Sequence, residues 1–241
     1  MVTAVDEHMR APLEEGFAAL GITPPPGAAQ ALLLYARRLL EQNQVMNLTA
    51  ITDPLGVCEL HFLDSAALIT QVRLEDSTLI DVGTGAGFPG LVLKLLVPSL
   101  RLTLLDSLGK RIAWLEGLCQ ELGLADVTCL HGRAEEAGHN PALREQFHWA
   151  TARAVAALPV LSELCLPFVA PGGAFLALKS EHSQGELSDA SALLTLFGGG
   201  TPRYMDYTLP LTGVPRRLIE IPKLTGTPSQ YPRKWSKIKR G

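Results

Sequence analysis

The chain has 241 residues, of which 47% are hydrophobic and 19% are charged, and its formal net charge is −3. This length supports a packed core, and the composition excludes a disordered protein, a fibre and a coiled coil. Apolar runs stay below the roughly 18 residues of a membrane span, and the first residues lack the pattern of a secretory signal, so we expect a cytoplasmic protein.

The first 70 residues carry apolar side chains at helical spacing. Residues 28–42 follow a Pro-Pro-Pro-Gly entry and repeat leucines and alanines along one face, and residues 54–71 carry leucines at similar spacing. Both patterns predict amphipathic helices. We therefore expect residues 1–72 to form an N-terminal helical cap.

From residue 73 onward, short apolar runs alternate with longer amphipathic stretches. The predicted strands are 79–82, 102–105, 127–130, 149–152 and 174–178, and the predicted helices between them are 91–96, 111–122 and 158–169. This alternation is typical of βαβ units and predicts a mostly parallel sheet with helices on both faces, within residues 73–224. Two last runs, 203–208 and 217–221, predict an antiparallel end that completes seven strands.

Positive charge is concentrated at the C-terminal end of the chain. Residues 216–241 hold eight basic residues and one acid, a net charge of +7 that leaves −10 for the first 215 residues. Within the basic tail, residues 225–241, Tyr231 and Trp235 stand among the cations. Aromatic rings beside cations favour contact with a polyanion such as RNA, although a solvated surface would give the same charge pattern.

A glycine-rich turn, Asp-Val-Gly-Thr-Gly-Ala-Gly-Phe-Pro-Gly at 81–90, follows the first predicted strand. Ligands of parallel sheets bind at this edge, beside the carboxyl ends of the strands. The spacing from Gly85 to Gly90 fits the dinucleotide-binding fingerprint. Asp106 follows Gly85 by 21 residues, where an acid that binds a ribose is expected. The turn therefore predicts a nucleoside-containing cofactor, and a turn that serves only close packing of strand and helix is the simpler alternative.

Two residues of the turn argue against a pyrophosphate. Asp81 would repel phosphate, and Pro89 lacks a backbone N–H where a phosphate would need one. S-adenosylmethionine has no phosphate, carries cationic groups suited to Asp81 and offers ribose hydroxyls to Asp106. We expect this cofactor, and an NAD-dependent reductase remains the first alternative.

Two further strand ends contribute candidate residues. Glu135 follows the third predicted strand, where it could bind the adenine edge, or it could simply be an acid at a helix N-terminus. Arg153 ends the fourth strand at the mouth of the expected pocket, where it could hold a ligand or be an ordinary surface charge. His61 could pack in the core or belong to a lid over the cofactor. Four cysteines match no zinc or redox spacing, so we expect no metal site.

Seven blocks stand out in combination from about residue 40 to the C-terminus. They are Asn47-Leu-Thr-Ala-Ile-Thr, His61-Phe-Leu-Asp-Ser65, the turn 81–90, Leu105-Asp-Ser-Leu-Gly-Lys-Arg111, Arg133-Ala-Glu135, Arg153-Ala-Val155 and Tyr231-Pro-Arg-Lys234. Together they resemble the RsmG (GidB) family of bacterial 16S rRNA methyltransferases. The resemblance implies a class I Rossmann-like methyltransferase fold and S-adenosylmethionine-dependent methylation of N7 of one guanine in 16S rRNA. It also implies cofactor contacts at Gly83, Phe88, Ala134, Glu135 and Arg153.

This reaction needs little from the protein beyond positioning. N7 of guanine carries an exposed lone pair and no proton, so we expect in-line transfer without a general base and assign no catalytic residue. RNA contacts are expected around the pocket rim, at Lys110, Arg111, Lys179, Arg233 and Lys234, each of which could otherwise be a solvated charge. The alternative from another class is a non-catalytic RNA-binding factor with the same fold.

Overall fold

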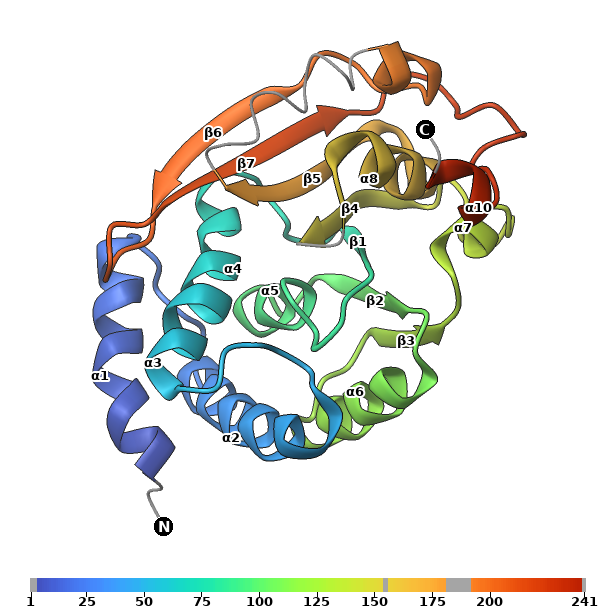
Figure 1. Ribbon diagram of the computed structural model, residues 1–241. Coiled ribbons are helices and arrows are strands. Elements are labelled where there is room, and N and C mark those ends of the chain that lie inside the picture. Colours follow the sequence, from blue (N-terminus) through green and yellow to red (C-terminus); the bar gives the residue numbers. More distant parts are fainter. Residues whose placement is uncertain (1–3, 154–155, 181–191, 240–241) are drawn as a thin grey trace.

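A seven-stranded sheet runs through the computed structural model, which describes residues 4–153, 156–180 and 192–239 (Figure 1). Ala154 and Val155 of the block at 153–155, and Arg240 of the basic tail, lie outside the described residues. The strands are β1 (Thr78–Val82), β2 (Arg101–Asp106), β3 (Val127–His131), β4 (Phe147–Arg153), β5 (Val169–Ser180), β6 (Arg203–Thr208) and β7 (Pro215–Pro222).

The strand order is β3-β2-β1-β4-β5-β7-β6. Strands β1 to β5 pair in parallel, and β7 pairs antiparallel with both β5 and β6. The order reverses beside β1, whose neighbours are β2 and β4, so the ligand-binding edge is expected at the carboxyl ends of these strands. This topology confirms the predicted mostly parallel, seven-stranded sheet with an antiparallel end.

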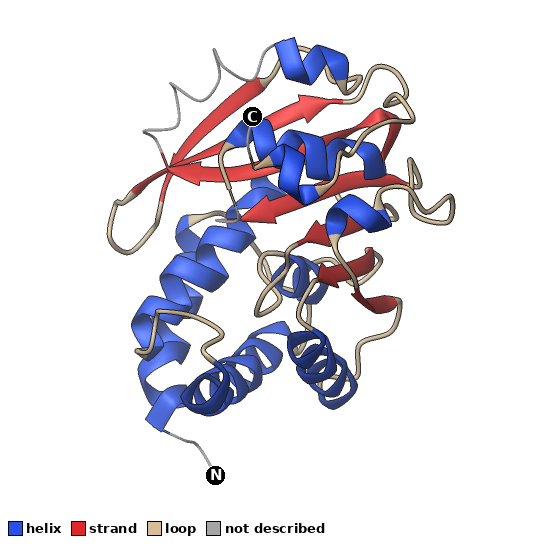
Figure 2. Cartoon of the chain, turned by 45° about the vertical axis from the view of Figure 1, so that its right-hand side comes forward, coloured by secondary structure: helices blue, strands red, loops and turns tan. Residues whose placement is uncertain are grey.

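Helices cover both faces of the sheet (Figures 1 and 2). They are α1 (Ala4–Ala19), α2 (Ala28–Met46), α3 (Pro54–Val57), the π-helical turn η1 (Cys58–Leu63), α4 (Asp64–Ala66), the 3₁₀ turn η2 (Ala67–Thr70), α5 (Gly90–Leu96), α6 (Gly109–Glu121), α7 (Ala134–Ala137), α8 (Leu158–Cys165), the 3₁₀ turn η3 (Leu166–Phe168) and α10 (Trp235–Ile238). Within the described ranges, none of these helices has the length and apolarity to cross a membrane.

Alternating side chains along each strand enter two separate hydrophobic clusters. Leu79 of β1 and Leu176 of β5 pack with the N-terminal helices, α5 and α6, whereas their neighbours Ile80 and Phe175 pack with α8. Successive residues of a strand point to opposite faces, so both faces of this sheet are buried. That double burial explains why the parallel strands are almost continuous apolar runs.

The segment predicted as one helix at 54–71 changes its winding three times. Asp53 caps its start by accepting a hydrogen bond from Gly56 N at 2.7 Å, and the chain then passes from α3 into the π-helical turn η1. Such wide turns are frequent at functional sites. In this chain η1 contains Glu59, which accepts hydrogen bonds from the backbone of the β6–β7 loop, and His61.

The helix predicted at 158–169 is shorter than expected. It ends at Cys165, a 3₁₀ turn follows, and β5 already begins at Val169, before the predicted start at 174. Pro167 lies in that turn and has no backbone N–H to continue the α-helix. The prediction of this boundary was wrong because the apolar pattern continues through the turn into the strand.

Candidate cofactor and substrate site

Two cavities lie at the carboxyl ends of the parallel strands. The β2–β3 cavity has a volume of about 260 Å³, and its walls include Asp106, Gly132, Ala134, Glu135, Leu161, Leu164 and Trp235. The cap cavity has a volume of about 590 Å³, and its walls include His61, Asp64, Phe88, Arg153, Lys179 and Arg216. Gly83 lines both. The two cavities therefore adjoin at the glycine turn.

The glycine turn needs glycine for its backbone conformation and for space. Gly83, Gly85 and Gly87 have φ angles of 70°, 60° and 97°, a region that L side chains rarely adopt. A Cβ at Gly87 would lie 2.7 Å from the hydroxyl of Tyr35. The turn is thus packed closely against α2 of the cap.

Asp81 lies behind the turn. Its side chain is fully buried and accepts hydrogen bonds from Thr84 Oγ1 at 2.6 Å and Gly90 N at 3.1 Å. Its Oδ1 has no hydrogen-bond partner among the described residues, and burial raises the pKa of Asp81 to about 7. Asp81 is not among the described residues that line either cavity, so its direct contact with a cofactor stays a prediction.

Asp106 ends β2 and lines the β2–β3 cavity, at the position predicted for a ribose contact. It is 4% exposed. Its carboxylate also accepts hydrogen bonds from Gly85 N at 2.9 Å and Leu108 N at 2.8 Å, and it lies 3.6 Å from Nη1 of Arg111. Asp106 therefore fixes the glycine turn, and Arg111, which is predicted to contact RNA, lies beside this carboxylate.

Ala134 and Glu135 start α7 directly beyond β3 and line the same cavity. Glu135 accepts a hydrogen bond from Arg133 Nε at 2.6 Å. Helix α8 contributes Leu161 and Leu164 to the lining of the same cavity. The cavity thus combines two carboxylates with an apolar surface.

Arg153 ends β4 and lies in the cap cavity, with 13% of its side chain exposed. One of its guanidinium nitrogens donates to Leu60 O at 2.9 Å and lies 3.4 Å from Asp64, and the other donates to His61 Nδ1 at 2.8 Å. Burial lowers the pKa of Arg153, but a guanidinium stays protonated in proteins. It is therefore a buried cation held by the cap.

His61 is held in one neutral tautomer by this contact. Because Nδ1 accepts from Arg153, Nε2 carries the proton and donates to Thr49 Oγ1 at 2.8 Å. Burial, and then the charge of Arg153, lower the pKa of His61 to about 3. The imidazole stacks on Phe88 with ring centroids 4.4 Å apart. His61 thus lines the cavity and packs at the same time.

Phe88, predicted to contact the cofactor, packs the glycine turn against the N-terminal helices. Besides His61, its ring stacks on Tyr35 with centroids 5.2 Å apart. The Tyr35 hydroxyl donates to Ala86 O within the same turn. Three residues of the cap and turn therefore form one stacked column beside the cavity.

Three charged or polar neighbours of Arg153 were missed by the sequence analysis as site residues. Asp64 accepts a hydrogen bond from the Tyr207 hydroxyl at 2.9 Å and lies 3.4 Å from Arg216 Nε. Tyr207 and Arg216 are opposite each other in the β6–β7 pairing. Asp64 could have been found, because it lies in the block 61–65, whereas the other two carry no local motif.

The residues predicted to contact RNA fall into different environments. Lys179 lines the cap cavity and donates to Ala156 O at 2.8 Å, and Lys110 and Lys234 are exposed. Arg233 donates through its Nη2 to Glu163 Oε2 at 2.7 Å, and that carboxylate is only 2% exposed. Arg233 thus neutralises a buried acid of α8.

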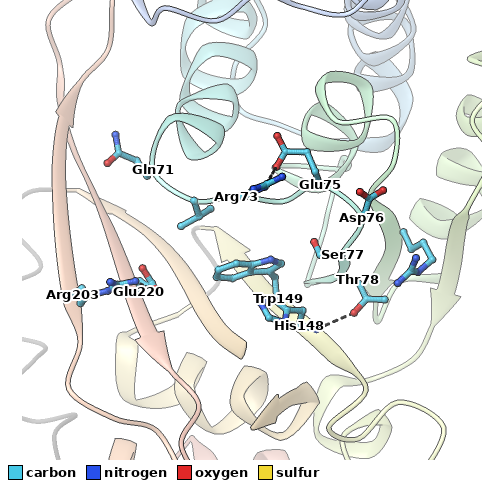
Figure 3. A pocket seen from close by; sticks show the side chains of 12 residues that line it. Gln71, Arg73, Glu75, Asp76, Ser77, Thr78, His148, Trp149, Arg203 and Glu220 are labelled. Carbon is cyan, nitrogen blue, oxygen red and sulfur yellow. Dashed lines mark hydrogen bonds and ion pairs between the residues drawn. The ribbon is translucent and has the colours of Figure 1, made fainter. Parts of the chain in front are cut away.

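A third cavity of about 670 Å³ lies at the opposite edge of the sheet, where β1, β2 and β4 begin (Figure 3). Its charges are largely paired: Arg203 lies 2.5 Å from Glu220, and Arg73 lies 3.7 Å from Glu75. Parallel sheets bind ligands at their carboxyl edge. The two cavities that meet at Gly83 are therefore the candidate site.

Comparison with known proteins decides the family. A family model described as rRNA small subunit methyltransferase G matches residues 28–203. The chain belongs to this family. It is 48% identical to ribosomal RNA small subunit methyltransferase G of Alkaliphilus metalliredigens over 92% of this chain and 93% of that protein, and 46% identical to the Lactobacillus acidophilus protein of the same name over 85% and 86%.

Solved structures support the fold of this family member. A SAM-dependent methyltransferase from Aquifex aeolicus superposes with a TM-score of 0.51 at 17% identity, covering 73% of this chain and 96% of that one. The YcgJ protein of Bacillus subtilis gives a TM-score of 0.52 at 14% identity, covering 69% of this chain and 100% of that one.

These comparisons confirm the predicted class I methyltransferase fold. They also confirm the predicted enzyme class, an S-adenosylmethionine-dependent rRNA methyltransferase, and its cofactor. The nicotinamide-dependent reductase is excluded.

The residues of the site fit S-adenosylmethionine. Carboxylates at the ends of β2 and β3 can accept hydrogen bonds from hydroxyl and amino groups, and the leucines of α8 offer an apolar surface to a ring. The buried carboxylate of Asp81, with one oxygen unpartnered among the described residues, suits a cationic ligand better than a phosphate.

Proposed function

We propose that the chain transfers a methyl group to N7 of a guanine in 16S rRNA, with the adenosine of the cofactor in the β2–β3 cavity and the guanine in the cap cavity. One observation carries this placement. Gly83 lines both cavities, so a donor in one and an acceptor in the other would lie next to each other at the glycine turn.

Each cofactor contact has a role that its position supports. Asp106 binds the ribose hydroxyls, while Glu135 and the backbone at Ala134 bind the adenine edge. Gly83, Gly85 and Phe88 shape the passage toward the cap cavity, where Arg153 provides a positive charge. Asp81 lies behind the glycine turn and supports it by accepting hydrogen bonds from Thr84 and Gly90, and its direct contact with the cofactor stays a prediction. When bound, S-adenosylmethionine supplies an electrophilic methyl group.

The substrate side needs positioning and charge. Among the described residues that line the cap cavity, Arg153, Lys179 and Arg216 are cations and Asp64 is an acid, which favours a polyanion. The neutral His61 cannot add charge there. Since N7 has no proton to lose, no group in this cavity has to act as a base.

The partner in this proposal is 16S rRNA or the small ribosomal subunit, in the cytoplasm. Lys110 in the first turn of α6 and Lys234 at the N-cap of α10 are exposed and would contact phosphates. Lys179 and Arg216 would contact RNA inside the cap cavity. Arg111 and Arg233 contribute less, because each faces a buried carboxylate.

The decisive experiment is transfer of a labelled methyl group to 16S rRNA from cells that lack this gene. Mass mapping should find the label on N7 of a single guanine, and Asp106→Ala should reduce transfer at subsaturating cofactor. Labelling at another atom would refute the assigned position. Binding of rRNA without any transfer would instead establish the non-catalytic RNA-binding factor.

A further inference from the structure

Trp235 is an aromatic side chain of the basic tail that lines the β2–β3 cavity. It is 37% exposed, and the other walls of the cavity there include Asp106, Glu135 and the α8 leucines. A large apolar ring that stays partly in water loses the benefit of burial unless something covers it. The cavity beside it is where the proposed function places adenosine.

The tail contacts helix α8 on both sides of Trp235. Two residues earlier, Arg233 donates to the buried Glu163 of α8 through its backbone N at 2.7 Å and through Nε at 2.9 Å. Three residues later, Ile238 is 2% exposed and packs in the cluster that contains Leu161 and Leu164. Residues three apart on a helical turn share a face. The burial of Ile238 against α8 therefore directs Trp235 toward the same side.

Hydrogen bonds also hold the segment before Arg233, residues 227–232, against the body of the protein. Arg144 donates to the carbonyl oxygens of Thr227 at 2.6 Å and Tyr231 at 2.8 Å, and His139 Nε2 lies 2.8 Å from Pro232 O. Glu145 accepts a hydrogen bond from Thr227 N at 2.7 Å. The segment is therefore bound to the body of the protein along its length, and the position of Trp235 is set before any ligand arrives.

We propose that Trp235 stacks on the adenine ring of the cofactor, which makes the C-terminal tail a wall of the cofactor site. This inference rests on the proposed placement of adenosine in the β2–β3 cavity. Indole presents a broad π face, and stacking on a purine needs no hydrogen-bond match. Asp106 and Glu135 then supply the polar contacts from the strand side, and Trp235 supplies the apolar one from the tail.

This arrangement places the cofactor beside the exposed cations of the tail. Lys234 precedes Trp235 directly, and Lys237 lies in the same short helix; both are exposed. The contacts of the tail hold this helix in place, so the adjacent cations lie beside the donor when it is bound.

The test uses the full-length chain and S-adenosylhomocysteine as the probe. Trp235→Ala should weaken its Kd in calorimetry by about 5-fold to 100-fold, the range expected when one base loses an aromatic stacking partner. Trp235→Phe should retain most of the affinity, and Trp235→Leu, which keeps apolar volume without a π face, should not. Leu224→Ala is the matched control, because Leu224 is 65% exposed and is not among the described residues lining the cavities.

Tryptophan fluorescence gives a second readout. The chain has three tryptophans, and saturating S-adenosylhomocysteine should change the emission of the wild-type protein but change that of Trp235→Phe much less. Equal emission changes in the two proteins, or a wild-type Kd in folded Trp235→Leu, would overturn the inference. If Asp106→Ala and Glu135→Gln still weaken binding, the placement of adenosine survives; if they too bind normally, that placement fails and the inference with it.

Discussion

The guanidinium of Arg153 lies over the ring of Phe88, with Cζ 4.9 Å from the ring centroid. One residue ends β4 and the other belongs to the glycine turn after β1, so this cation–π contact joins neighbouring strand ends across the cap cavity. His61, stacked on the same ring and hydrogen bonded to Arg153, completes the contact from the cap.

Replacing Arg153 by lysine should weaken this junction even though the charge is kept. A lysine cannot donate to Leu60 O and His61 Nδ1 in the same fork geometry. Leaving buried acceptors unpaired costs about 1–3 kcal/mol, so we expect that loss in the free energy of unfolding together with a higher Kd for S-adenosylhomocysteine. Urea unfolding and calorimetry measure the two quantities. A variant with unchanged stability would show that these hydrogen bonds carry no net energy.

The lowered pKa of His61 predicts sensitivity to acid. The pKa of His61 is about 3 in the folded chain and has its ordinary value of 6.5 in the unfolded chain. Between these two pH values the unfolded chain binds more protons than the folded chain. The stability that neutral His61 contributes is therefore fully present above pH 6.5 and is lost as the pH falls. From pH 7 to pH 5 the wild-type protein should lose up to about 2 kcal/mol more than His61→Gln. Urea titrations at three pH values test this, with the exposed His148→Gln as control.

The raised pKa of Asp81 predicts that the free energy of unfolding falls as the pH rises. Its pKa is raised to about 7, so the folded chain binds more protons than the unfolded chain between pH 4 and 7, and stability falls as the pH rises through that window. Asp81→Asn cannot ionise. Between pH 5 and pH 8 the wild-type protein should lose about 1–3 kcal/mol that the variant keeps. Parallel stability curves for the two proteins would mean that Asp81 titrates normally.

Asp106 holds the glycine turn and is the proposed ribose contact of the cofactor. Asp106→Ala removes charge-assisted hydrogen bonds to the proposed ribose and leaves Gly85 N and Leu108 N without their acceptor. Cofactor binding should weaken by about 1.5–3 kcal/mol, which calorimetry with S-adenosylhomocysteine measures. Asp106→Asn, which keeps the size of the side chain, should lose less. Unchanged affinity in both variants would remove Asp106 from the site.

The basic residues should separate into two groups. Lys110→Ala and Lys234→Ala should each reduce the slope of log K for RNA against log salt by roughly 0.7–0.9, because each removes one phosphate contact. Arg233→Ala should instead reduce the free energy of unfolding by about 1–3 kcal/mol, since the buried Glu163 loses its side-chain partner and keeps only the hydrogen bond from the backbone N of residue 233. Filter binding at several salt concentrations and urea unfolding distinguish the groups. A stable Arg233→Ala protein with a reduced salt slope would contradict this division.

Local patterns in the sequence predicted the parts of the site that lie at strand ends. The glycine turn, Asp106, Glu135 and Arg153 all follow a predicted strand, and parallel strands bring such residues to one edge of the sheet. Asp64 could also have been inferred from its block. These residues owe their positions to the order of strands and helices, which periodicity reveals.

Partners from distant segments could not be predicted. Arg233 and its partner Glu163 are 70 residues apart, and Tyr207 and Asp64 are 143 apart. Nothing in either local sequence marks these contacts, because they depend on how helices and strands pack in three dimensions. The placement of Trp235 over the β2–β3 cavity has the same origin: it depends on Ile238 packing against α8.

The stacked column of Tyr35, Phe88 and His61 has a practical consequence for protein engineering. An excised catalytic half that started near residue 73 would lose two of these rings and the acceptor groups that orient Arg153. It would also uncover the leucines of β1, β2 and α5, which share a single cluster with α1 and α2. We expect such a fragment to aggregate, so no shorter autonomous enzyme can be cut from this chain at that boundary.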